Sequence, residues 1–119
     1  MSYEVKESRA YPGPASAVAA AVQEEVVQLG GKLAKASKPA EGYLEANFNK
    51  EVGGKSFGNR VQLVVRVAGE SAERCALTID AYPVDPLGKK LLFGVLGAPA
   101  KLVIDALCAR LDARLGKGG

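Results

Sequence analysis

Residues 60–82 read RVQLVVRVAGESAERCALTIDAY, and this stretch decides the fold. Apolar and polar residues alternate in both of its halves, and a Gly- and Glu-containing break at residues 69–73 separates them. Alternation with period two is typical of strands that bury one face. The apolar members that we expect to face the core are Val61, Leu63, Val65, Val67, Cys75, Leu77, Ile79 and Ala81. The stretch therefore predicts an antiparallel hairpin with one covered face.

The sequence on either side extends this sheet. Residues 43–52 alternate as well, and Gly53-Gly54 after them predicts a tight hairpin turn, because both glycines tolerate positive φ. Residues 2–10 alternate weakly and predict a short edge strand. Residues 32–37 and 89–96 are candidates for further short strands. Together these segments predict a sheet of about four to six strands.

Two segments have the period of an amphipathic helix. Apolar residues recur every three or four positions in residues 14–29 and again in residues 99–115. Each segment opens on a proline, which suits the first helical turn, and Gly30-Gly31 is a strong stop for the first one.

These elements follow one another in the order β-α-β-β-β-(β)-α. The economical arrangement is a two-layer α+β domain, with both helices packed on the apolar face of the antiparallel sheet. We expect Val22, Leu63, Ile79 and Leu107 to share its core. Residues 1–119 are predicted to be a single domain, with an ordered core over about 2–115 and a flexible tail at 116–119.

The order of elements from Tyr3 to Leu115 resembles the helix-grip architecture of START-like and Bet v 1-like lipid carriers. It is equally similar to one half of a TATA-binding-protein-like domain. The first resemblance implies a small apolar ligand held between the second helix and the sheet. The second implies nucleic acid, which is disfavoured because exposed aromatic residues for base stacking are scarce.

Composition excludes several function classes. There are 16 basic and 13 acidic residues, for a net charge of +3, and they are dispersed, so nothing indicates a nucleic-acid or membrane-surface partner. The most apolar stretch, residues 91–100, is too short and broken to span a membrane. Cys75 and Cys108 lie in apolar runs and are interpreted as buried, reduced thiols. With no leader-like segment at the start, these features predict a cytoplasmic protein.

No catalytic motif is present. The chain has no histidine, which removes Ser-His-Asp and Cys-His arrangements and most zinc or iron sites, so no cofactor or metal is expected. Glu45, Asp80 and Asp85 are isolated carboxylates, interpreted as solvated or as acceptors of loop hydrogen bonds. Residues 53–58, GGKSFG, lack the strand and helix that flank a phosphate-binding loop. The sequence predicts a protein that is not an enzyme.

Two features are candidate binding sites. Five large apolar residues crowd one segment, and a strand covered on one face would leave some of them exposed: Leu91, Leu92, Phe93, Val95 and Leu96. The segment either binds a partner, gates a ligand, or is a strand covered on both faces. The second feature is an outward row of residues that lines a polar groove or is simply a solvated sheet face: Arg60, Gln62, Val64 and Arg66.

The function that these patterns favour is a non-enzymatic binding domain for a small apolar ligand or a protein partner. The alternative is a structural module that self-associates, as a homo-oligomer, through residues 87–96. A nucleic-acid binder and a carboxylate-based enzyme are less favoured.

Overall fold

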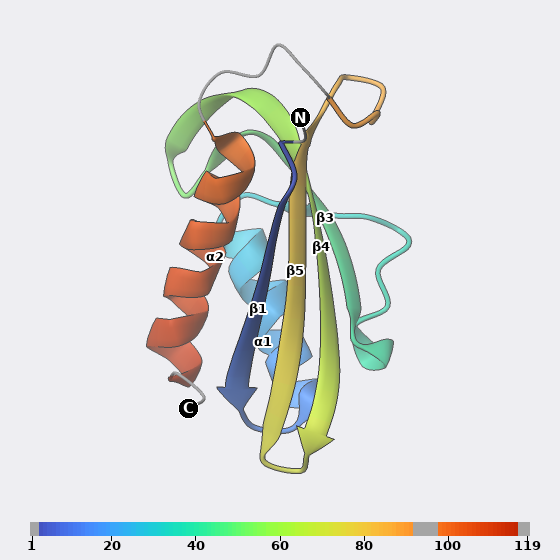
Figure 1. Ribbon diagram of the computed structural model, residues 1–119, viewed down its shortest axis with the longest axis vertical. Coiled ribbons are helices and arrows are strands. Elements are labelled where there is room, and N and C mark those ends of the chain that lie inside the picture. The colour runs from blue at the N-terminus through green and yellow to red at the C-terminus, as the bar shows by residue number, and fades with distance from the viewer. Residues whose placement is uncertain (1–2, 92–97, 117–119) are drawn as a thin grey trace.

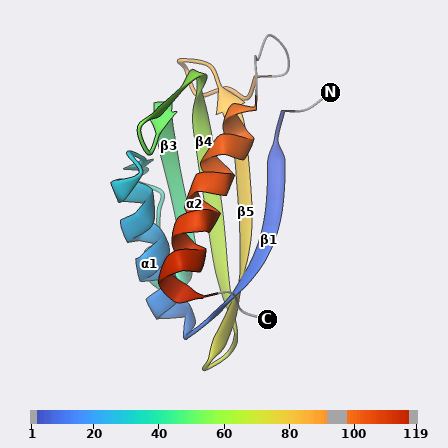
Figure 2. The same ribbon diagram turned by 90° about the vertical axis from the view of Figure 1, so that its left-hand side faces the viewer.

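The computed structural model describes residues 3–91 and 98–116. A five-stranded antiparallel sheet is covered on one face by two helices (Figures 1 and 2), which confirms the α+β prediction. The elements are β1 (Val5–Pro12), α1 (Ala15–Gln28), β2 (Lys32–Leu33), a 3-10 turn (Pro39–Glu41), β3 (Tyr43–Val52), β4 (Lys55–Ser71), β5 (Arg74–Val84) and α2 (Pro99–Leu115). No described helix is long and apolar enough to cross a membrane.

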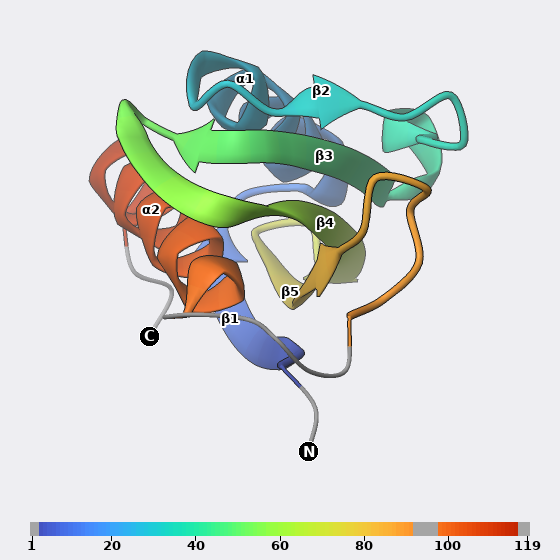
Figure 3. The same ribbon diagram turned by 90° about the horizontal axis from the view of Figure 1, so that it is seen from above.

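The strands lie in the order β1-β5-β4-β3-β2, so the first strand of the chain pairs with the last. Figure 3 shows the resulting twisted sheet from above, with β1 at one edge and β2 at the other. The predicted strand at residues 32–37 is shorter than expected, because only Lys32 and Leu33 pair with β3. Of the strand expected at residues 89–96, Lys90 forms an isolated bridge with Val84, and residues 92–97 lie outside the described residues.

The core lies between the helices and one face of the sheet. Leu63 stands opposite Ala46 on β3 and Ala81 on β5, so inward-facing residues meet across the central strands. Val22, Leu63, Ile79 and Leu107 belong to one cluster and are at most 1% exposed. The apolar alternation in residues 60–82 therefore identified the buried face correctly.

The two helices are joined to each other by a buried carboxylate. Glu25 of α1 is 7% exposed and accepts hydrogen bonds from Arg110 Nε (2.8 Å) and Arg114 Nη1 (3.1 Å) of α2. Burial raises the pKa of Glu25, but the hydrogen bonds from Arg114 and Arg110 outweigh it and hold that pKa below its ordinary value. The carboxylate therefore stays ionised between two arginines and holds the helices in one relative position.

Candidate functional site

The face of the sheet that the helices leave uncovered carries the predicted row on β4. Arg60, Gln62, Val64 and Arg66 alternate with core residues, as the sequence indicates. Val64 stands between Glu45 on β3 and Asp80 on β5 and is only 9% exposed. The middle of this face is thus packed by its own side chains.

Gln62 belongs to a hydrogen-bonded chain that runs across this face. Its amide group donates to Glu45 Oε1 and accepts from Asn47 Nδ2 (3.3 Å), while the Tyr43 hydroxyl donates to Glu45 Oε2 (2.9 Å). The hydrogen bond to Glu45 raises the pKa of the Tyr43 hydroxyl. Gln62 and the candidate carboxylate Glu45 are therefore bonded to each other.

Arg66 lies beside this chain. Its guanidinium is 5.5 Å from the centroid of the Tyr43 ring and 3.9 Å from Asp80 Oδ2. The Asp80 side chain is 17% exposed, and its Oδ1 atom has no hydrogen-bond partner among the described residues. The guanidinium of Arg66 is thus positioned on the open face of the sheet by the Tyr43 ring and the Asp80 carboxylate.

Arg60 lies at the end of the row in a different setting. It lines a depression of about 570 Å³. The loop containing Asp85 and the start of the apolar segment at Leu91, which the sequence analysis also singled out, line the same depression. We call this the Arg60 depression, and its lining residues are Asn49, Lys50, Gly58, Asn59, Arg60, Val84, Asp85, Pro86 and Leu91. Of the predicted site residues that the structure describes (Arg60, Gln62, Arg66 and Leu91), Arg60 and Leu91 are brought together in this lining.

A bulge in the β3–β4 hairpin shapes the Arg60 depression. The pairing passes from Asn49–Arg60 to Glu51–Ser56, so three residues of β4 stand opposite the single residue Lys50. Lys50 adopts a left-handed conformation with φ of 65°, which is uncommon for a residue other than glycine. The bulge changes the direction of the backbone at Lys50 and Asn59, and both residues line the Arg60 depression.

The Arg60 guanidinium is oriented by neutral groups. Its Nε donates to Asn49 Oδ1 (3.2 Å) and its Nη1 donates to the Pro86 carbonyl (3.4 Å). Asp85, the acidic residue in the lining, accepts hydrogen bonds at Oδ1 from the backbone N–H groups of Leu87 (2.8 Å) and Lys89 (2.9 Å). The Asp85 carboxylate therefore accepts hydrogen bonds from the backbone of its own loop.

A second depression, of about 430 Å³, shares Asn49 and Arg60 with the first one. It extends past the short strand β2 to Lys32 and to the glycines after α1. Lys32, Lys50 and Arg60 form no ion pair with any carboxylate in the described part of the chain. Three cations thus line two adjoining depressions near one end of the open face, and none of them is paired with a carboxylate that the structure describes.

The apolar segment is described only at its start. The Leu91 side chain is half-buried, and its N–H donates to the Pro83 carbonyl (2.9 Å). Leu92, Phe93, Val95 and Leu96 lie outside the described residues, so their predicted role stays a prediction.

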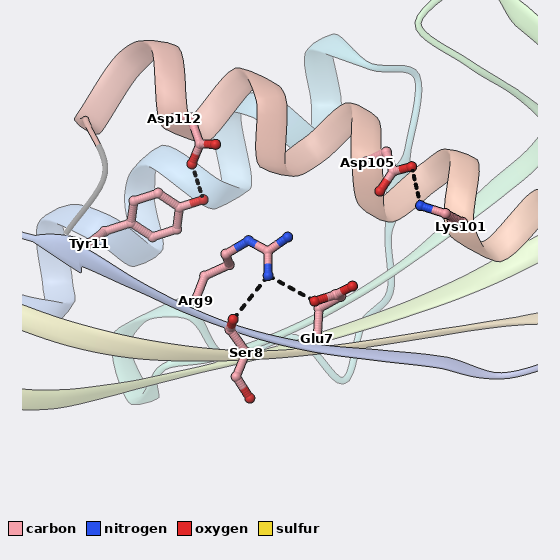
Figure 4. Close-up of polar contacts among 7 residues, drawn as sticks. All are labelled: Glu7, Ser8, Arg9, Tyr11, Lys101, Asp105 and Asp112. Carbon is pink, nitrogen blue, oxygen red and sulfur yellow. Dashed lines mark hydrogen bonds and ion pairs between the residues drawn. The ribbon is translucent and has the colours of Figure 1, made fainter. Parts of the chain in front are cut away.

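On the helix-covered face of the sheet, β1 carries a row of polar side chains that the sequence analysis did not identify. Figure 4 shows Glu7, Arg9 and Tyr11 on the side of β1 that faces α2, with Ser8 pointing away. Tyr11 donates its hydroxyl hydrogen to Asp112 Oδ1 (2.9 Å), and Arg9 Nη1 donates to Glu7 Oε2 (2.8 Å). The sequence could have indicated this row. Glu7 and Arg9 are two and four residues after the apolar residue Val5, so in a strand they lie on the same face as Val5.

Both cysteines are free and buried, as predicted, with Cys75 0% and Cys108 5% exposed. Burial raises the pKa of each thiol. Both thiols therefore stay protonated at neutral pH and are poor nucleophiles.

Comparisons with known proteins add little. No protein-family model matches this sequence, and no curated protein matches it. A protein of Thermobifida fusca, solved by solution NMR as a structural-genomics target, is similar along 98% of both chains, with 15% identity and a TM-score of 0.42.

Proposed function

We propose that this domain is a non-enzymatic binding module, and that the Arg60 depression is its site. The ligand that fits is a small amphipathic anion, in which a carboxylate or phosphate group is attached to an apolar body. One observation carries the proposal. Arg60 and Lys50 line a depression with an apolar wall, and neither has a carboxylate partner among the described residues.

The polar side of the depression suits the anionic group. The bonds to Asn49 and the Pro86 carbonyl use two of the five guanidinium N–H groups of Arg60 and fix its plane. The remaining N–H groups can donate to two oxygens of one carboxylate or phosphate, which is the geometry that arginine favours. Lys50 adds a second positive charge, and the amide of Asn59 adds a donor in the same lining.

The other side suits the apolar body. Leu91 is half-buried and Pro86 is exposed, so these two side chains offer most of the apolar surface of this wall, while Val84 is 3% exposed and adds little. The volume of about 570 Å³ lies within the range of small-ligand pockets. Transfer of a short alkyl chain onto this wall contributes roughly 25 cal/mol per Å² of apolar surface removed from water.

The space between α2 and the sheet is a poorer candidate for such a ligand. Val103, Ile104, Leu107 and Leu111 of α2 are all 0% exposed. They pack directly against the buried face of the sheet in one continuous cluster. A ligand there would have to displace these side chains, whereas the Arg60 depression is open.

A titration followed by backbone NMR shifts tests the proposal. The probes are octanoate, octyl phosphate, octanol and acetate, which separate the charge from the chain and the carboxylate from the phosphate. Octanoate or octyl phosphate should bind with shifts concentrated at residues 49–50, 58–60 and 84–91, and the tighter of the two identifies the head group. Octanol and acetate should each bind at least about tenfold more weakly, because each lacks one of the two contacts.

Variants locate the charged contact. Arg60→Gln and Lys50→Asn should each weaken octanoate binding by about tenfold, and asparagine tolerates the left-handed backbone at position 50. Arg74→Gln is the matched control, because Arg74 starts β5, whose other end, Val84, borders the depression. Binding without these shifts, or binding unaffected by both variants, would refute the proposal. Shifts confined to α2 would instead support a ligand between helix and sheet.

A further inference from the structure

The outer edge of β1 is a strand edge without a partner in the described structure. β1 pairs with β5 on one side only, and Figure 2 shows it at the margin of the sheet beyond α2. We propose that a second copy of this chain pairs there, β1 against β1 in antiparallel orientation, about a two-fold axis at Ser8. The two five-stranded sheets would then form one continuous sheet. This inference is independent of the proposed ligand site, which lies on β3, β4 and the β5 loop.

The backbone of β1 presents its free hydrogen-bonding groups at alternate residues. The Gly13 N–H donates to the Glu73 carbonyl, so position 13 points toward β5. In an antiparallel ladder every second residue directs its backbone groups the same way. The backbone N–H and carbonyl groups of Glu7, Arg9 and Tyr11 therefore point toward β5. Lys6, Ser8 and Ala10 therefore direct their N–H and carbonyl groups outward. Pro12 has the outward parity too, and its missing N–H costs no bond to β5.

The side chains select the register about Ser8. In that register Ser8 faces Ser8 of the partner subunit, and Lys6 faces Ala10 of the partner subunit, so all outward groups of these residues are paired. Between them, Glu7 stands directly opposite Arg9 of the partner subunit, and the symmetry repeats this pair. Directly opposed residues at such positions have their side chains close together, and opposite charges there are favourable.

Neighbouring symmetric registers are unfavourable. An axis at Lys6, Glu7 or Arg9 places each of these charges opposite its own copy. An axis at Ala10 brings Ser8 opposite Pro12, which lacks the required N–H. The charges of Lys6, Glu7 and Arg9 and the missing N–H of Pro12 therefore together disfavour the neighbouring registers, and the charges also discourage pairing with unrelated strands.

The environment of Glu7 and Arg9 supports the exchange of partners. Their side chains are 35% and 38% exposed and now bond to each other within the strand at 2.8 Å. They lie under α2 near Lys101 and Asp105, on the covered side of β1 (Figure 4). Association would keep each charge paired while it satisfies the outward backbone groups of β1.

Charge reversal tests the register directly. Sedimentation and mass measurements on the natural chain should give a concentration-dependent species of twice 12.4 kDa. Glu7→Arg places two arginines opposite each other at both pairs, and Arg9→Glu places two glutamates there. Each single variant should raise the dimer dissociation constant by about tenfold or more. Mixed in equal amounts, the two variants should associate with each other, because every facing pair is then of opposite charge. The double variant Glu7→Arg/Arg9→Glu should likewise dimerise.

Two further variants act as checks. Ala10→Pro removes an outward N–H from each copy and should weaken the dimer, with folding verified by circular dichroism. Leu87→Lys alters an 84%-exposed residue in the other candidate self-association segment and should leave the dimer intact. A natural chain that stays monomeric at high concentration overturns the proposal. So does failure of the mixed variants to associate, or a dimer that Leu87→Lys dissociates and the charge reversals leave unchanged.

Discussion

Gly42→Ala should destabilise the domain by more than its surface position suggests. Gly42 follows the 3-10 turn with φ of 76°, and its carbonyl accepts a hydrogen bond from the Val67 N–H (2.8 Å). A side chain in the left-handed region costs about 1–2 kcal/mol. The added Cβ would also overlap the Val67 carbonyl oxygen, which belongs to the backbone and cannot rotate away. Separating the two segments forfeits the hydrogen bond, about 0.5–1.5 kcal/mol more. The expected total is about 1.5–3.5 kcal/mol.

Gly54→Ala is the matched control, because Gly54 has φ of 85° and no atom within 4 Å of an added Cβ. It should show the left-handed cost alone. Urea unfolding of both variants, compared at constant m-value, measures the difference between them. If Gly42→Ala is no more destabilising than Gly54→Ala, the close approach of Gly42 to Val67 does not exist in solution.

Three more outcomes are expected. Ile79→Ala should cost about 2–5 kcal/mol in thermal or urea unfolding, because Ile79 is 0% exposed, and a loss below about 1 kcal/mol would contradict its place in the core. Glu25→Gln should cost about 1–2 kcal/mol at neutral pH, a modest value because Arg110 and Arg114 are 44% and 39% exposed and can regain water. Since the folded state lowers the pKa of Glu25, its contribution is present above the ordinary pKa and is lost as the pH falls through the lowered one. The pH dependence of unfolding should therefore flatten at acidic pH in the Gln variant. Both cysteines should resist a thiol reagent until denaturant is added, and rapid labelling of the native protein would show that they are accessible.

The sheet and both helices were predictable because their signals are local. Residues 60–82 alternate within each strand, and the start of α2 at Pro99 follows from proline chemistry at one position. Each of these features needs only a few neighbouring residues to be recognised.

The arrangement of the site could not be predicted in the same way. The pairing of β1 with β5 joins residues 5–12 to residues 74–81, which are far apart in the sequence, and no local pattern encodes it. Lys50 enters the Arg60 depression through a bulge and a left-handed backbone, which the side-chain sequence does not show. Val64 has outward parity but is covered by longer neighbours that only the register identifies. The place of Arg60 on the open face was predictable, because it follows from the alternation of β4 alone.

The β1–β5 pairing also has a consequence for synthesis on the ribosome. In the described sheet Val5 pairs with Ala81, so β1 is translated well before β5, the strand with which it pairs. At ordinary elongation rates of about 5–20 residues per second, β1 stays unpaired for several seconds. Its three charged residues, Lys6, Glu7 and Arg9, keep it soluble during that interval. The β3–β4 and β4–β5 hairpins close over short loops and are available first, so β1 is expected to dock last, onto a sheet that is already formed.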